Sequence, residues 1–304
     1  MKIATTTEDF AFYCATDEER IRELHRAGFR YIDLSLYAFD EDLTYLSDAW
    51  KPAIDRLQSL ADSLGMQFVQ AHSHGVNPLT ASPERAAFHI RAVERSIEIC
   101  ERLGIPNTVL HCAFAPGLSR DKSFAKNKEY VSQFFPLLER TGVNLLLENS
   151  TAANMKEIYY PNTGADLRAM IEYIGHPNIH ACWDTGHANC EGSQYEQIMA
   201  LGEHLRGIHY NDNHGMKDEH LMPYLGTMNH DEILHALIDV GYRGYFTLEA
   251  GSSLVKRNGW PYKRRAFERD TRLADPQLFM QQHIEALLYD TAKYMLEAYN
   301  LFEE

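Results

Sequence analysis

The chain has 304 residues, of which 45% are hydrophobic, so it is long enough to bury the core of one α/β barrel. Its formal net charge of −14 would repel a phosphate backbone, which argues against a general nucleic-acid-binding protein. It has no apolar run of about 18 residues and no signal-peptide pattern, so we expect a cytoplasmic protein without a membrane span. Its five cysteines form no Cys-x-x-Cys pair, so we expect neither a disulfide framework nor a cysteine-type zinc site.

Short apolar segments with strand character alternate with amphipathic segments along the whole chain. Eight strands are expected, at residues 3–6, 31–35, 67–71, 108–111, 143–148, 179–183, 207–209 and 245–249. Helices are expected between them and after the last one, at residues 52–64, 86–103, 165–174, 195–205, 231–240 and 277–299. Glycines that stop a helix just before the next strand support this alternation, as at Gly28, Gly65, Gly104 and Gly241.

The repeated strand–helix order predicts an α/β fold, a closed (β/α)8 TIM barrel that forms a single domain over residues 1–304. An open doubly wound sheet is the alternative, but it would usually carry a glycine-rich phosphate loop after the first strand, and residues 5–9 contain no glycine. A long polar loop at about 251–275 precedes the last helix, at about 277–299. Its length is typical of a lid or a contact arm, and it is basic within an acidic protein.

Residue types that bind metals stand at or just past the ends of six consecutive expected strands, and they are His72, His111, Glu148, Asp184, His209 and Glu249. The carboxyl ends of barrel strands face one shared mouth, so these side chains should meet there. Carboxylates gathered without a cation would repel one another and raise their own pKa values. We therefore expect a divalent-metal site made by Glu148, Asp184, His209 and Glu249, and this ligand mixture suits Mn²⁺, Zn²⁺, Co²⁺ or Mg²⁺.

A second group of polar residues lies near the same strand ends, and its members are candidates for binding the substrate or additional zinc ions. They are His72, His111, His187, Asp218 and His220. Asp218 and His220 form an Asp-x-His pair in an expected loop. His72 and His74 alternate along a strand that should stop near Gly75, so one of them should face the mouth, and we favour His72. No site for an organic cofactor is expected.

Four stretches resemble the xylose isomerase-like TIM barrels, a superfamily of sugar isomerases and epimerases that also includes endonuclease IV-type DNA repair enzymes. They are Leu147-Glu-Asn149, Trp183-Asp-Thr-Gly-His187, residues 208–226 with the pair Asp218-Glu-His220, and Gly241-Tyr-Arg-Gly-Tyr-Phe-Thr-Leu-Glu249. The resemblance covers the chain well from the fifth to the eighth strand and loosely before that. It implies a metal-dependent isomerase or epimerase of sugars or sugar phosphates, which moves a proton next to a carbonyl through a metal-stabilised cis-enediolate.

The resemblance also implies roles for single residues. Glu148 and Glu249 would move the proton besides holding the single metal ion, and His187 would contact a substrate oxygen. Keto-sugar epimerases of this group carry an arginine shortly after the strand-seven histidine, whereas Lys217 is the only cation within residues 213–218 here. The sequence therefore does not single out a ketohexose 3-epimerase, and isomerisation and epimerisation remain alternatives. We expect a small carbohydrate as the partner, no nucleic acid and no membrane, and the chain is compatible with a homo-oligomer.

Two other activities are alternatives within the superfamily. The endonuclease IV-like branch, a phosphodiesterase, holds three zinc ions with nine ligands, and nine candidates exist here: His72, His111, Glu148, Asp184, His187, His209, Asp218, His220 and Glu249. The acidic charge and the lack of basic and aromatic loops that could penetrate DNA argue against this alternative. The other is a lyase similar to inosose dehydratase, acting on a polyol ketone.

Overall fold

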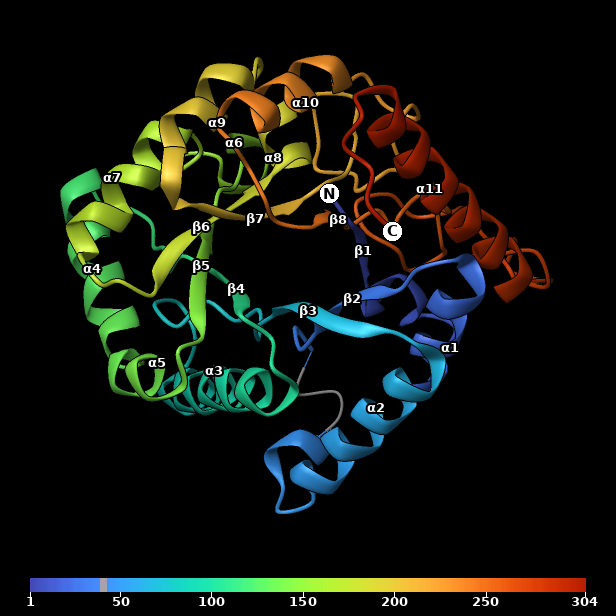
Figure 1. The fold of residues 1–304 in the computed structure, drawn as a ribbon, viewed down its shortest axis with the longest axis horizontal. Helices are drawn as coiled ribbons and strands as arrows, with labels where there is room; N and C mark the ends of the chain where they lie inside the picture. The colour runs from blue at the N-terminus through green and yellow to red at the C-terminus, as the bar shows by residue number, and fades with distance from the viewer. Residues whose placement is uncertain (39–42) are drawn as a thin grey trace.

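The structure is a computed structural model that describes residues 1–38 and 43–304. In these residues eight parallel strands surround a central axis, with the helices on the outside (Figure 1). The strands are β1 (Ile3–Thr6), β2 (Tyr31–Ser35), β3 (Gln67–His72), β4 (Asn107–His111), β5 (Asn144–Glu148), β6 (Ile179–Asp184), β7 (Leu205–His209) and β8 (Phe246–Leu248). The expected (β/α)8 TIM barrel is therefore confirmed.

The ring of strands closes between β7 and β8. The hydrogen-bonded order is β7-β6-β5-β4-β3-β2-β1-β8, and Tyr210, just past β7, forms a parallel bridge with Leu248 of β8. The backbone N–H of Tyr210 donates to the carbonyl of Thr247 at 2.7 Å, and the backbone N–H of Glu249 donates to the carbonyl of Tyr210 at 3.2 Å. Glu249 is thereby held at the seam of the barrel, next to the end of β7.

The described residues form helices, most of which cover the outer side of the barrel, whereas the short α6 and α8 directly follow the ends of β5 and β6 (Figure 1). They are α1 (Asp17–Ala27), α2 (Trp50–Leu64), α3 (Pro83–Leu103), α4 (Arg120–Ser132), α5 (Phe135–Thr141), α6 (Ala152–Met155), α7 (Gly164–Ile174), α8 (Thr185–Asn189), α9 (Tyr195–Leu201), α10 (His230–Asp239) and α11 (Leu278–Ala298), with 3₁₀ turns η1 (Thr7–Phe10), η2 (Leu43–Leu46) and η3 (Gly202–His204). None of the helices in residues 1–38 and 43–304 is long and apolar enough to cross a bilayer.

Some boundaries differ from those expected. The helix expected at 195–205 ends at Leu201, because Gly202 adopts a positive φ of 54° and the turn η3 leads into β7. The helix α4 was not expected at all, since its sequence is mostly polar and buries few apolar side chains, Phe124, Tyr130 and Val131. In the structure α4 packs against α7, where the rings of Phe124 and Tyr173 lie 5.8 Å apart, and the hydroxyl of its Tyr130 contacts His89 of α3. These tertiary contacts supply the burial that the weak sequence pattern does not predict.

Alternation along the strands divides the barrel interior into an apolar layer and a polar layer. The apolar layer consists of Val109, Leu146 and Cys182, which form a buried cluster separate from the main core. A step of two residues along β4, β5 and β6 keeps the side chain on the inside and reaches His111, Glu148 and Asp184. The apolar layer lies below these polar residues, which therefore face the mouth at the carboxyl ends of the strands.

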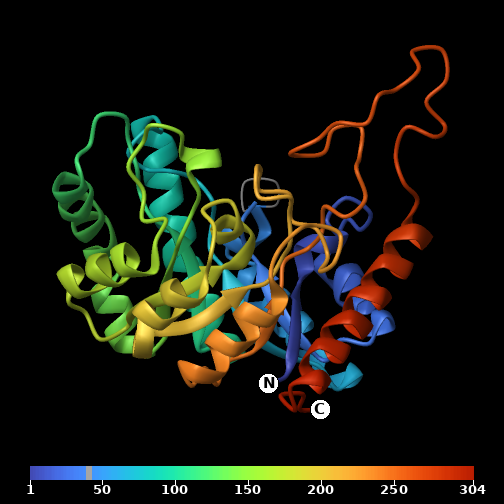
Figure 2. The same cartoon turned by 90° about the horizontal axis from the view of Figure 1, so that it is seen from above.

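The segment between β8 and α11 leaves the barrel. It runs past the N-terminal end of α11 and rises beyond the rest of the molecule before it returns, drawn in orange in Figure 2. We call residues 251–275 the arm. Its position matches the long loop expected from the sequence.

Candidate metal and proton-transfer site

Four residues from consecutive strands converge at the mouth of the barrel, and we call them the inner cluster. Glu148 ends β5, Asp184 ends β6, His209 ends β7, and Glu249 directly follows β8. One ligand atom from each lies within 4.8 Å of the others. Nδ1 of His209 is 2.7 Å from Oε1 of Glu148 and 3.4 Å from Oε2 of Glu249. The four candidates for a single metal ion therefore meet at one point.

The inner cluster fits a divalent cation. Three carboxylates and one imidazole are ligands that Mn²⁺, Zn²⁺, Co²⁺ and Mg²⁺ accept. Burying carboxylates side by side is costly unless a counter-charge is present. In this cluster burial raises the pKa of Asp184, and it raises the pKa of Glu249 to about 7. A bound cation would favour the charged form of both side chains and remove this cost.

The two glutamates of the inner cluster differ in their tendency to ionise. Burial opposes ionisation of Glu148, but His209 and His111 outweigh it and hold its pKa well below the usual range. At Glu249 burial dominates and the pKa is about 7. Glu148 is thus a carboxylate at neutral pH, whereas Glu249 is close to its titration point. A pair of carboxyl groups with separated pKa values is suited to giving and taking protons.

Asp33, which sequence analysis missed, orients His209 from behind. Nε2 of His209 is 3.3 Å from Oδ2 of Asp33 in β2, and the side-chain amide of Gln70 donates to the same oxygen at 2.9 Å. With Nε2 facing Asp33, Nδ1 is left for the inner cluster. A carboxylate in this outer position fixes the ring of a metal-binding histidine and raises its basicity. The one sequence signal for this role was a carboxylate within an apolar strand, at Asp33. The signal could not be interpreted locally, because the partner His209 is 176 residues away in the sequence.

We expect Asp33→Asn to weaken metal binding by roughly 10- to 100-fold, the usual effect of losing such an outer partner. Asparagine keeps the shape of the side chain but removes the charge that favours a proton on Nε2. Competition with a fluorescent chelator measures the affinity. Asp121→Asn on the surface of α4 is the matched control. Equal affinities for both variants would show that Asp33 has no part in orienting His209.

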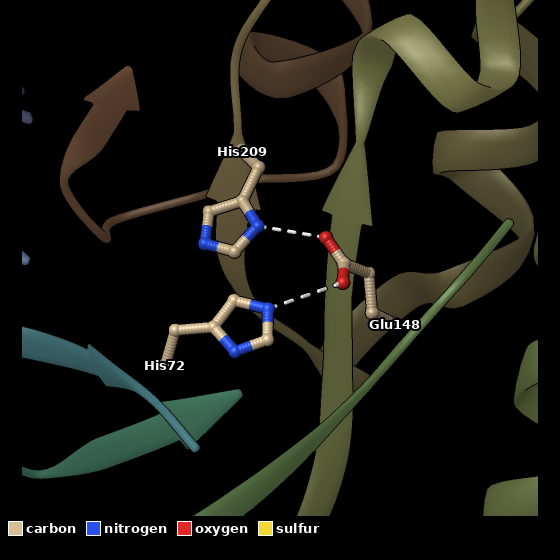
Figure 3. A group of neighbouring side chains, drawn as sticks. All are labelled: His72, Glu148 and His209. Carbon is tan, nitrogen blue, oxygen red and sulfur yellow. Dashed lines mark hydrogen bonds and ion pairs between the residues drawn. The ribbon is translucent and has the colours of Figure 1, made fainter. Parts of the chain in front are cut away.

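Glu148 also contacts two histidines of neighbouring strands. Its Oε2 is 2.8 Å from Nε2 of His111 and 3.7 Å from Nε2 of His72. Figure 3 shows the rings of His72 and His209 side by side, each facing one oxygen of Glu148. His74 turns away from this group, and its Nδ1 lies 3.0 Å from Nδ1 of His89. Glu148 therefore links the rest of the inner cluster to a second pair of ligand-type side chains, His72 and His111.

His187, Asp218 and His220 form a further group beside the inner cluster. Asp218 Oδ2 is 2.9 Å from Nε2 of His187, and its Oδ1 is 3.1 Å from Nε2 of His220. One ligand atom from each lies within 4.8 Å of the others. The carbonyl of Asn149 is 3.0 Å from Nδ1 of His187 and sets the orientation of its ring. All nine ligand-type residues predicted from the sequence thus gather around one mouth.

The loop that carries Asp218 and His220 is shaped by Asp212, another residue that sequence analysis missed. The carboxylate of Asp212 accepts hydrogen bonds from the backbone N–H groups of Tyr224, Gly226 and Met228, at 3.0 to 3.2 Å. A side chain added at Gly226 would lie 2.3 Å from Asp212 Oδ1, so glycine is required at this close approach. The geometry of this loop therefore depends on one buried carboxylate.

Tyr37, also missed, lies on the wall of the cavity into which these groups open, a cavity of about 1280 Å³. Its ring centroid is 5.2 Å from that of His72 and 5.8 Å from that of His111. A Cβ at position 75 would be 2.0 Å from this ring, so Gly75 makes room for it. Burial, Glu8 and Glu148 raise the pKa of Tyr37 to about 12, and the phenol therefore stays protonated at neutral pH.

Comparison with known proteins agrees with this architecture. The family model of the xylose isomerase-like TIM barrel matches residues 21–270. A fructoselysine 3-epimerase from Shigella flexneri is 23% identical over 265 residues, covering 83% of this chain and 91% of that protein. An uncharacterized protein from Methanocaldococcus jannaschii is 26% identical over 203 residues, covering 64% of this chain and 68% of that protein.

A crystal structure of D-psicose 3-epimerase in the presence of D-fructose superposes with a TM-score of 0.73 at 20% identity, covering 97% of this chain and 99% of that one. At 20% sequence identity, the similarity to this structure shows a shared fold and no more. Both named relatives are sugar epimerases, which are isomerases. Because the family model matches most of the chain and the strands form the corresponding barrel, this chain belongs to the xylose isomerase-like TIM barrel family.

Proposed function

We propose that the chain is a divalent-metal-dependent epimerase or isomerase of a sugar or sugar derivative. One observation carries this proposal: the inner cluster joins a metal-binding ligand set to two glutamates that are placed to move a proton, Glu148 and Glu249. The similarity to a fructoselysine 3-epimerase and to D-psicose 3-epimerase supports it. Among the alternatives left open by the sequence, these two relatives favour epimerisation.

The glutamates would act on a carbon-bound proton next to the substrate carbonyl. A divalent ion at the inner cluster would supply the positive charge that stabilises the enolate formed when this proton leaves. One of the two glutamates, as a carboxylate, takes the proton, and the protonated carboxyl group of the pair returns one. In the reverse direction the two exchange these roles. Return to the opposite face of the same carbon gives the epimer, and return to the neighbouring carbon gives the isomer.

Other residues of the mouth would hold the substrate and exclude water. His187 is oriented by Asn149 toward the cavity and is suited to contact a substrate oxygen. Tyr37 and Trp260 line the cavity and supply apolar surface for a sugar face. Water excluded from this space would strengthen each electrostatic interaction within it.

Exchange of substrate protons with deuterated solvent tests the function. The metal-loaded protein is incubated in D₂O with free ketoses, ketose phosphates and amino-acid-linked ketoses, and NMR reports the labelled carbon and the product. We expect deuterium next to the carbonyl of at least one sugar, together with its epimer or isomer. The double variant Glu148→Gln, Glu249→Gln is the control. Absence of exchange from the whole panel would contradict the proposal, and loss of water from the sugar would point to the dehydratase alternative.

Tyr37→Phe should lower kcat/KM by roughly tenfold, the effect of removing one hydrogen bond to a polar transition state. The ring that packs against His72 and His111 stays, so the histidines keep their positions. Steady-state kinetics on the sugar identified by exchange measures the effect. Tyr195→Phe removes a hydroxyl at the protein surface, where it donates to Asp239, and serves as the control. If the two variants behave alike, the Tyr37 hydroxyl does not contact the substrate.

A second candidate function is a phosphodiesterase with three zinc ions, and the group of His187, Asp218 and His220 favours it. This group offers a complete second set of metal ligands beside the inner cluster. His72 and His111, together with Glu148, offer ligands for a third metal ion. Metal analysis of the purified protein together with cleavage of DNA that contains an abasic site decides between the two candidates. About one tightly held ion and intact DNA agree with the epimerase, whereas about three zinc ions and cleaved DNA would replace it.

A further inference from the structure

Glu8 is a carboxylate on the wall of the catalytic cavity that the proposed reaction does not use. It lies in the turn η1, two residues past the end of β1, and it is exposed, whereas its neighbours Thr7 and Asp9 are buried. Glu8 lines the same cavity into which the inner cluster opens. Its side chain therefore faces the space in which the substrate would bind.

The barrel places Glu8 one strand away from a glutamate of the inner cluster. β1 lies between β2 and β8, and Thr5 of β1 is in register with Leu248 of β8 (Figure 1). Thr6 is therefore beside Glu249, and Glu8 follows two residues later, at the mouth. Since adjacent strands lie about 4.8 Å apart, a ketose with its carbonyl at the inner cluster can reach Glu8 with another part of its chain.

Contacts at the ends of β1 and β2 fix the position of Glu8. The hydroxyl of Ser35 donates to Oε2 of Glu8 at 3.0 Å, and the backbone N–H of Glu8 donates to Oγ1 of Thr6 at 3.2 Å. The backbone N–H of Ser35 in turn donates to Oγ1 of Thr7 at 3.0 Å. None of the described residues donates a hydrogen bond to Oε1 of Glu8, so this oxygen is available to a ligand.

Glu8 forms no ion pair within the described part of the chain. Two arginines on the same wall of the cavity are already paired with other acids, since Arg20 lies 3.1 Å from Asp17 and Arg56 lies 3.6 Å from Glu18. The negative charge of Glu8 is therefore not balanced by either of them.

Lys256 is a further cation close enough to interact with Glu8, but its contacts lie elsewhere. Its Nζ lies over two aromatic rings, 5.4 Å from the centroid of Phe12 and 5.8 Å from that of Tyr13. Residues 39–42, which lie outside the described part, include no lysine or arginine. A cationic group of the substrate would therefore supply the direct counter-charge that the chain does not give Glu8.

We propose that the substrate is a ketose that carries a protonated amino group, and that Glu8 determines this specificity by binding the ammonium group. The inference rests on the proposed function and narrows its substrate class. A hydrogen bond from an ammonium group to a carboxylate is about twice as strong as one between neutral groups, so Glu8 discriminates an amine from a hydroxyl. A phosphate at the same position would face a like charge and be disfavoured.

Pairs of ketoses that differ in one group, a hydroxyl or an amino group at the first or last carbon, test the proposal. Deuterium exchange and steady-state kinetics of the metal-loaded protein measure kcat/KM for each member. We expect a value at least about tenfold higher for the amino ketose of one pair, and Glu8→Gln should remove most of this preference. Equal values within every pair, or a preference that survives Glu8→Gln, would overturn the proposal.

Glu157→Gln is the matched control, because Glu157 is exposed and lies outside the cavity wall, and this variant should keep the preference. Glu8→Lys should reverse it, so that a ketose phosphate is favoured over the amino ketose. Circular dichroism and thermal unfolding verify that the variants are folded. A Glu8→Lys variant that is folded and still prefers the amino ketose would contradict the assignment of Glu8.

Calorimetric titration of the same pairs separates this proposal from the proposed function, because it measures binding without turnover. If no sugar exchanges deuterium, the proposed function fails. In that case, binding of an amino ketose that Glu8→Gln weakens about tenfold would still support Glu8 as an ammonium site. Binding that is indifferent to Glu8→Gln would overturn it.

Discussion

A Glu249→Gln variant should fold like the unchanged protein but turn over its sugar roughly 10²- to 10⁴-fold more slowly, the usual contribution of a positioned acid or base. Glutamine keeps the size of the side chain and an oxygen that can face a cation, but it cannot exchange a proton. Glu249 is held at the barrel seam by its backbone contact with Tyr210, so the substitution should leave the closure of β7 and β8 unchanged. Turnover is measured at saturating metal, so that weaker metal binding is not mistaken for lost proton transfer.

Glu139→Gln is the matched control for this experiment, since Glu139 is an exposed residue on α5 with a side chain that is 67% exposed. Thermal unfolding of both variants measures whether the fold is retained. An unchanged kcat for Glu249→Gln would remove this residue from proton transfer. In that case Glu148, the other carboxyl group of the inner cluster, would have to serve as both acid and base.

Removal of the metal should abolish turnover and destabilise the fold. Dialysis against a strong chelator removes the divalent counter-charge from the three carboxylates of the inner cluster, those of Glu148, Asp184 and Glu249. A ligand present at 100 times its dissociation constant stabilises the folded state by about 2.7 kcal/mol, so the chelated protein should lose stability of this order. Metal analysis, calorimetry and kinetics before and after dialysis measure the three effects.

Restoring the ion is the other half of this experiment. Addition of Mn²⁺, Co²⁺, Zn²⁺ or Mg²⁺ in turn should recover both activity and stability for at least one of them, and the recovered protein should hold about one ion per chain if the inner cluster alone is filled. Full turnover in excess chelator would contradict a metal-dependent reaction. If an ion restores stability but not turnover, the metal has a structural role and takes no part in the reaction.

The barrel and the ligand-type residues at its mouth were predictable because both depend on local patterns. Alternation along each strand and the position of a residue relative to the strand end can be read within a few neighbouring residues. His111, Glu148 and Asp184 were expected at the ends of consecutive strands, and the structure has them there. The helix α4 could not be predicted in this way, because its few buried side chains acquire their environment only once α3 and α7 are in place.

The sequence by itself determined the order of strands and helices and the set of ligand-type residues that share the mouth, since these follow from periodicity along the chain. Only the tertiary structure decided which residues support that set. Asp33 meets His209 across 176 residues of sequence, and Tyr37 reaches His72 and His111 because Gly75 leaves space for its ring. Such contacts arise from the closure of the barrel, which brings the inner faces of distant strands within hydrogen-bonding distance, and no local pattern encodes them.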